Sequence, residues 1–173
     1  MKFHLFALAL LVSACSVTGV APSYRDTSVP LSVTTRGAPA GEFGKMAGPW
    51  FLRAGYSRDY DLAMVNFLPG YASGNAVELR RAACDLSGDC VTEDTVLRAT
   101  ALGQNRWQLN GIESRELWVI WVDDNFRTAA IGTPDGSYAW ILNREARGGA
   151  DRLRAAREIL EFNGYDTSRL TER

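Results

Sequence analysis

Histidine is nearly absent from this sequence of 173 residues, because the only one, His4, lies close to the N-terminus. We expect that N-terminal segment to be removed, which would leave the remaining domain without an imidazole. Such a domain has no Ser–His or Cys–His nucleophile, no histidine base and no histidine metal ligand. We therefore expect no catalytic residue, no metal ion and no cofactor.

A strong charge of either sign is also lacking, since the formal net charge is −1. This balance gives no indication of a nucleic-acid partner. The apolar run at residues 5–12 is far shorter than the roughly 20 residues that a membrane-spanning helix needs. It follows Lys2 and precedes the small residues Ser13 and Ala14, which is the order of a secretory signal peptide. We interpret residues 1–14 as a signal peptide.

Cysteine is scarce, and the first of the three, Cys15, directly follows this segment. Leu11-Val12-Ser13-Ala14-Cys15 resembles the lipobox of bacterial lipoproteins, in which the cysteine is acylated and becomes the new N-terminus. Two or three acyl chains give stable membrane attachment, whereas one chain anchors only marginally. The alternative is an ordinary signal peptide with a chance cysteine at the cleavage site. In Gram-negative lipoproteins a residue such as Ser16 at the next position accompanies sorting to the outer membrane, so we expect an outer-membrane lipoprotein that faces the periplasm.

Residues 15–44 have the composition of a linker. They contain Pro22, Pro30 and Pro39 and many small or polar residues, and they show no hydrophobic period. We therefore expect a flexible tether here, followed by one domain at residues 45–173.

That domain contains short runs in which apolar and polar residues alternate, and turn residues separate the runs. Closely spaced strands of this kind are typical of an all-β, mainly antiparallel barrel or sandwich. We expect a long loop at Tyr56–Asn75. Between Ala76 and Leu102 the sequence does not show where one strand ends and the next begins. The seven expected strands are Trp50–Gly55, Ala76–Cys84, Thr95–Leu102, Arg106–Leu109, Glu116–Val122, Phe126–Gly132 and Ser137–Asn143.

A single helix is expected near the C-terminus. Residues 151–163 place Leu153, Ala156 and Leu160 on one face, and Gly164 is suited to end the helix. The strand at residues 117–122 is apolar on both faces, so its outer face needs a cover. The helix is the candidate for that cover.

Three short motifs resemble the signatures of the lipocalin family. Gly48-Pro49-Trp50 resembles the Gly-x-Trp signature of the first strand, although proline is unusual inside a strand. The acidic turn from Asp123 to Phe126 resembles the second signature, and Arg144 resembles the arginine that closes the last strand. The tail at residues 163–170 looks like that of bacterial outer-membrane lipoprotein lipocalins. The resemblance implies a small up-and-down β-barrel with one C-terminal helix packed on its wall.

This resemblance gives the signature residues Gly48, Trp50, Asp123, Phe126 and Arg144 structural roles. An indole at the closed end of a barrel excludes water. A guanidinium stacked on that indole contributes roughly 0.5–2 kcal/mol, and its remaining donors can bind loop carbonyls.

The other two cysteines, Cys84 and Cys90, lie six positions apart. In an oxidising periplasm we expect them to form a structural disulfide across a hairpin. A redox role would need the shorter Cys-x-x-Cys spacing, and a metal site would need further ligands.

Strand alternation, and for residues 117–121 the resemblance to the strand before the acidic turn, indicate which side chains point into the barrel and could bind a ligand. The resemblance implies a small apolar ligand of the fatty acid or lysophospholipid class, and the long first loop would form a lid over the open end. The alternative is that bulky aromatic residues fill the interior and that the protein is a ligand-free structural or interaction module. Carboxylates such as Asp59, Asp61, Glu93 and Asp94 lie in expected loops or turns, so we expect them to be solvated rather than catalytic. The expected inward residues are Trp50, Leu52, Ala54, Leu117, Val119, Trp121, Tyr138, Trp140 and Leu142.

Overall fold

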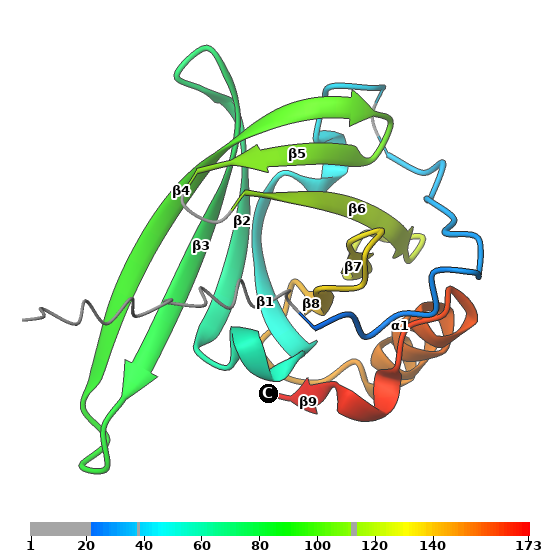
Figure 1. Ribbon diagram of the computed structural model, residues 1–173. Coiled ribbons are helices and arrows are strands. Elements are labelled where there is room, and N and C mark those ends of the chain that lie inside the picture. Colours follow the sequence, from blue (N-terminus) through cyan, green and yellow to red (C-terminus); the bar gives the residue numbers. More distant parts are fainter. Residues whose placement is uncertain (1–21, 38, 112–113) are drawn as a thin grey trace, which may run out of the picture.

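The computed structural model describes residues 22–37, 39–111 and 114–173, so the expected signal peptide and Cys15 lie outside the described residues. Eight antiparallel strands form one sheet in the order β2-β3-β4-β5-β6-β7-β8-β1, and β1 also pairs with β2, which closes the barrel (Figure 1). The mainly antiparallel barrel with one helix is confirmed. The strands are β1 (Gly48–Gly55), β2 (Leu62–Tyr71), β3 (Gly74–Cys84), β4 (Cys90–Gly103), β5 (Arg106–Asn110), β6 (Arg115–Val122), β7 (Thr128–Gly132), β8 (Ala139–Asn143) and the short β9 (Thr171–Glu172), which pairs with β1.

Strand β2 lies where the sequence analysis expected a long loop, so the prediction of a lid at Tyr56–Asn75 is wrong. The connection from β1 to β2 is short and contains only the 3-10 helix η2 (Ser57–Asp59). A bulge between Leu62 and Met64 shifts the alternation of β2 by one residue. That shift, together with Pro69 and Gly70 in the strand, hides its period in the sequence. The strand absent from the seven expected ones therefore precedes Ala76, and β3 and β4 pair directly.

Helix α1 (Ala150–Phe162) covers the outer face of the barrel at β6, β7 and β8, as expected. Its buried residues Ala156 and Leu160 pack in an outer cluster that includes Ile120 of β6 and Ile141 of β8. The two apolar faces of β6 are thereby explained, since one faces the barrel interior and the other faces the helix. In the part of the chain that the structure describes, no helix has the length and apolarity to cross a membrane.

The barrel interior holds the larger apolar cluster, in which three tryptophans are fully buried. The barrel has two ends, which we name after Arg144 and Asp59, the residues that lie there. The Arg144 end carries the β2–β3, β4–β5 and β6–β7 connections and the 3-10 helix η1 (Gly44–Met46). The Asp59 end carries η2 and the β3–β4, β5–β6 and β7–β8 connections.

Residues 22–37 and 39–42, expected to be part of a flexible tether, are held against the barrel and form a segment that we call the strap. The Tyr24 amide donates to the Gly136 carbonyl at 3.0 Å, and Arg25 forms a β-bridge with Tyr165. Further along, the side-chain amide of Asn105 donates to the Thr34 carbonyl at 2.6 Å. These contacts run down the wall beside α1 (Figure 1), so the tether prediction is wrong from residue 22 onward.

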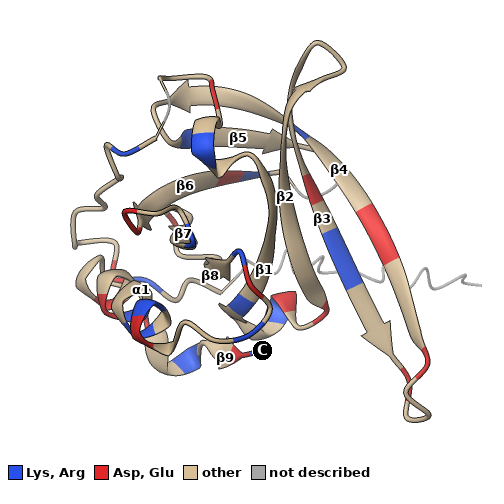
Figure 2. Cartoon of the chain, turned by 180° about the vertical axis from the view of Figure 1, so that it is seen from behind, with Lys and Arg blue, Asp and Glu red and all other residues tan. Residues whose placement is uncertain are grey.

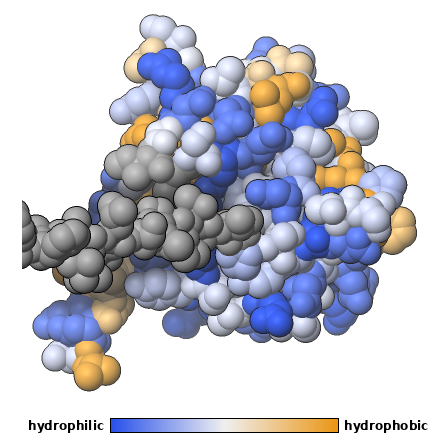
Figure 3. Space-filling model, viewed as in Figure 1, coloured by the Kyte–Doolittle hydropathy of each residue, from blue (hydrophilic) through white to orange (hydrophobic). Residues whose placement is uncertain are grey.

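The β3–β4 hairpin projects beyond the body of the barrel, and a disulfide joins Cys84 to Cys90 as expected. Arg80 of β3 and Asp94 of β4 pair across this hairpin at 2.7 Å. At the tip Leu86 is fully exposed. Figure 3 shows apolar surface at the projecting tip and otherwise only small apolar patches on a mainly hydrophilic face.

Candidate functional site

The Arg144 end of the barrel is closed by the residues that the first and third signatures provide. The Arg144 guanidinium lies 3.9 Å from the centre of the Trp50 ring. It donates to the carbonyls of Lys45, Ala47 and Pro49 at 2.7–2.9 Å, while the Trp50 indole donates to the Met46 carbonyl at 2.8 Å. Partial burial lowers the pKa of Arg144 from its ordinary value. The end is thus plugged by a cation stacked on an indole.

The second signature forms a tight turn at the same end. The Asp123 carboxylate accepts the amides of Arg127 and Thr128 at 2.7 and 2.5 Å. Phe126 adopts a positive φ of 56° in this turn, and its ring packs against the interior cluster beneath the Lys45 ammonium. Gly48 also has a positive φ, 91°, and a Cβ there would come within 3.4 Å of the Arg144 guanidinium. All five signature residues therefore meet at the closed end.

Most of the expected inward residues do lie in the interior, and each is at most 3% exposed. These interior residues are Trp50, Leu52, Leu117, Val119, Tyr138, Trp140 and Leu142. Two others do not, because Ala54 and Trp121 pack in the outer cluster beside α1. Bulges explain both errors: the pairing shifts by one residue between Leu52 and Ala54 and between Val119 and Trp121. An extra residue moves every later side chain to the other face of its strand.

The described interior is packed rather than hollow around these side chains. Trp107, Phe43 and Phe67 join them, with ring centres 4.9 and 5.1 Å from Phe43. Each of these rings is at most 1% exposed, so little space remains beside them for a ligand.

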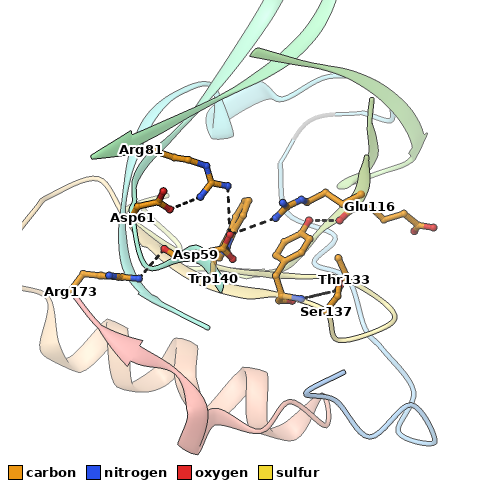
Figure 4. Close-up of polar contacts among 10 residues, drawn as sticks. Asp59, Asp61, Arg81, Glu116, Thr133, Ser137, Trp140 and Arg173 are labelled. Carbon is orange, nitrogen blue, oxygen red and sulfur yellow. Dashed lines mark hydrogen bonds and ion pairs between the residues drawn. The ribbon is translucent and has the colours of Figure 1, made fainter. Parts of the chain in front are cut away.

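At the Asp59 end, polar and charged groups sit directly above this packed interior (Figure 4). Asp59 is completely buried, and its Oδ2 accepts the Trp140 indole N–H at 2.9 Å. Its Oδ1 lies 3.9 Å from an Arg81 guanidinium nitrogen and 3.8 Å from one of Arg115. Arg81 also binds Asp61 at 2.6 Å. Two carboxylates and two guanidiniums thus balance one another in a largely desolvated cluster.

Aromatic rings form the floor of this charged cluster. The Arg115 guanidinium lies 4.8 Å from the centre of the Tyr138 ring and 5.8 Å from that of Trp140. Burial raises the pKa of Tyr138 well above its ordinary value, although the positive charge of Arg115 acts in the opposite direction. The hydroxyl therefore stays protonated and donates to the Glu116 carbonyl.

A cavity of about 340 Å³ opens onto this cluster. Glu93 and Thr95 of β4 form its far wall, and Tyr60 at its rim is 69% exposed. Pockets that hold small ligands begin at about 300 Å³. The cavity can therefore accept a small ligand or a headgroup. Its lining residues are Arg58, Asp59, Tyr60, Asp61, Arg81, Glu93 and Thr95.

This cluster was not predicted from the sequence, because Asp59 was expected to be a solvated loop carboxylate. Its partners Arg115 and Trp140 come from β6 and β8, far away in the sequence. Glu93 and Asp94 are exposed as expected, but they lie within strand β4 rather than in a loop or turn. Among the described residues, no group of three or more histidine, cysteine, aspartate or glutamate side chains could hold a metal ion.

Solved structures with the same architecture identify the fold. Lobster apocrustacyanin A1 aligns with a TM-score of 0.54 and 15% identity over 74% of this chain and 76% of its own. H1 crustacyanin from the lobster Homarus americanus gives 0.53 and 14% over 80% and 78%. The barrel has the lipocalin fold. Proteins with the lipocalin fold are generally binding or transport proteins rather than enzymes, and lipocalins bind small hydrophobic ligands.

The sequence comparisons point to the same fold over the C-terminal part of the chain. Residues 104–173 match the family model of the lipocalin-like domain. Temperature-induced lipocalin-1 from Arabidopsis thaliana is 36% identical over 55 residues, which are 32% of this chain and 30% of that protein. The chain thus aligns with less than a third of that relative.

Proposed function

We propose that the protein binds a small amphipathic lipid, of the fatty acid or lysophospholipid class, at the Asp59 end of the barrel. The observation that carries the proposal is the cavity there, whose walls are mostly charged and which reaches Asp59, the acceptor of the buried Trp140 indole. A lipid headgroup would contact Arg81 and Asp61 near the rim, where both side chains keep some exposure. The apolar part would lie toward Tyr138 and Trp140. No catalytic residue, metal or cofactor enters this proposal.

The packing beneath the cluster limits how a ligand can enter. Tyr138 and Trp140 stack with ring centres 4.5 Å apart, and both are completely buried. A long acyl chain reaches the interior only if these rings move, which costs packing energy. We therefore expect short or single-chain lipids to bind more tightly than two-chain phospholipids.

Thr95 offers a way to block the cavity without disturbing the core. It lies on the inner face of β4, two residues before the buried Leu97, and it is only partly buried. Thr95→Trp should fill the cavity and weaken lipid binding about tenfold or more, measured by displacement of a fluorescent fatty acid from the purified protein. The matched control is Val96→Trp, since Val96 is 40% exposed on the outer face of the same strand. Equal affinities of the two variants would contradict this site.

A second candidate function is a ligand-free interaction module, and the packed interior favours it. This reading predicts no binding by the unmodified protein across fatty acids, lysophospholipids and neutral lipids. It also predicts co-purification of a defined protein in stoichiometric amount. Saturable lipid binding that Thr95→Trp abolishes would exclude this reading.

We further propose that the chain is exported and carries a lipid on Cys15, in the outer membrane of a bacterial cell envelope. The support is the sequence from Leu11 to Cys15, with its resemblance to a lipobox. Cys15→Ser should leave the precursor uncleaved and unacylated. Membrane fractionation and mass spectrometry of the N-terminal peptide measure both effects. Unchanged fractionation of the variant with the outer membrane would contradict the anchor.

A further inference from the structure

A groove on the outside of the barrel lies between β1 and α1, and its rim residue Arg173 borders the charged cluster at the Asp59 end. It has a volume of about 340 Å³. Ala54 and Ile141 form an apolar floor, and Leu153 of α1 forms part of one wall. Both floor residues are at most 3% exposed, so they belong to the outer cluster. The groove therefore offers a firm apolar surface.

The rim of the groove carries four arginines and one glutamate. Arg53 comes from β1, Arg154 and Arg157 come from α1, and Glu172 and Arg173 come from β9 and the residue after it. Figure 2 shows basic segments on β1, on α1 and beside the C-terminus. The side chains around the groove thus carry a clear excess of positive charge.

Neutral acceptors hold two of these guanidiniums. Arg53 donates to the carbonyls of Glu145 and Gly148 at 3.3 and 3.0 Å. Arg173 donates to the carbonyls of Asp59, at 2.8 Å, and of Tyr60. A carbonyl orients a guanidinium but does not neutralise it, so these positive charges remain available to an anion.

The helix arginines add to this excess. Arg157 donates to the Thr167 carbonyl at 2.6 Å and pairs with the exposed Glu172 at 3.2 Å. Arg154 is exposed and has no ion-pair or hydrogen-bond partner among the residues that the structure describes. The Nε donor of Arg53 is shielded from solvent and meets no acceptor in the described part of the chain. An unmet buried donor is costly, and an anionic oxygen would satisfy it.

We propose that this groove is a second binding site, which takes a small amphiphile with a compact anionic group. The anion, a phosphate or carboxylate, lies among the arginines, which suit planar and two-point recognition of such oxygens. The apolar part of the ligand lies on Ala54, Ile141 and Leu153. This site and the cavity at the Asp59 end share no lining residue.

Three probes that share parts of this chemistry test the site in the purified protein. Octyl phosphate, below its micellar concentration, should bind in isothermal titration calorimetry, and its affinity should fall as salt is raised. Octyl glucoside has the same chain without the charge, and inorganic phosphate has the charge without the chain. Octyl glucoside should bind at least about tenfold more weakly, since it lacks a charge-assisted hydrogen bond. Inorganic phosphate should also bind at least about tenfold more weakly, because it buries no apolar chain. An affinity of either probe equal to that of octyl phosphate would overturn the proposal.

Matched charge reversals locate the binding. Arg154→Glu should weaken octyl phosphate about tenfold. Arg98→Glu changes the net charge equally on the exposed face of β4 and should leave the affinity unchanged. An equal loss of affinity for octyl phosphate in both variants, or no loss in either, would contradict binding at this groove. Thr95→Trp should leave octyl phosphate binding intact, so a failure of the first lipid site and a failure of this one give different results.

Discussion

The stacked pair of Arg144 and Trp50 makes a quantitative prediction about stability. Arg144→Met removes a cation–π contact at 3.9 Å, worth roughly 0.5–2 kcal/mol, and three hydrogen bonds to carbonyls at 2.7–2.9 Å, besides a longer one of 3.5 Å to the Phe126 carbonyl. The guanidinium is only about half-buried, so water can replace part of that bonding, and each bond counts for about 0.5–1 kcal/mol. The free energy of unfolding should fall by about 3 kcal/mol. For a domain of this size that corresponds to a melting temperature roughly 6–12 °C lower.

Urea unfolding followed by circular dichroism measures this loss. Arg144→Lys keeps the charge but loses the forked donors, so it should fall between the wild type and Arg144→Met. Arg154→Met serves as the control, because Arg154 is exposed and the described residues give it no partner; it should change stability by less than about 0.5 kcal/mol. A loss in the free energy of unfolding below about 1 kcal/mol for Arg144→Met, or one no larger than that of Arg154→Met, would contradict this role of Arg144.

Three further perturbations test the packing elsewhere. In Gly132→Ala the new Cβ would lie 2.3 Å from the Tyr165 hydroxyl, so we expect a loss of about 1–3 kcal/mol in urea unfolding, whereas Gly74→Ala meets nothing closer than 3.6 Å and should cost far less. Burial raises the pKa of Tyr165 above its ordinary value, so its contribution to stability is complete below about pH 10 and is lost as the pH rises further; the part of the absorbance change at 295 nm that Tyr165→Phe removes should therefore coincide with the loss of circular dichroism, and ionisation of Tyr165 in the folded protein would contradict this. Replacing Cys84 and Cys90 by serine should cost about 2 kcal/mol or less and expose the hairpin tip to protease, and general cleavage of the barrel instead would show that the disulfide supports more than the tip.

Alternation along a strand predicted inward residues correctly until a bulge intervened. Leu52 and Val119 lie inside as predicted, but the next expected inward residues, Ala54 and Trp121, lie outside. The amino-acid composition of each strand does not reveal the extra residue of its bulge. Strand β2 was missed for the same reason, because its bulge at Leu62 removes the period of two.

The closed end was predictable and the charged cluster was not. Trp50 and Arg144 could be assigned because each belongs to a local motif with a known partner. Asp59 lies in a short connection, where carboxylates are usually solvated. Its burial depends on Arg115 and Trp140, which only the closure of the barrel brings to the same place.

The strap determines how the barrel could face a membrane. Its first described contacts, from Tyr24 to Gly136 and from Ser23 to the Asp135 carbonyl at 2.6 Å, lie at the β7–β8 turn, which belongs to the Asp59 end. Only residues 16–21 separate Cys15 from the described chain, and seven fully extended steps span at most about 25 Å. With a lipid on Cys15, the anchor would therefore leave the barrel beside its charged cavity. A lipid leaving the bilayer could then reach that cavity without a rotation of the barrel.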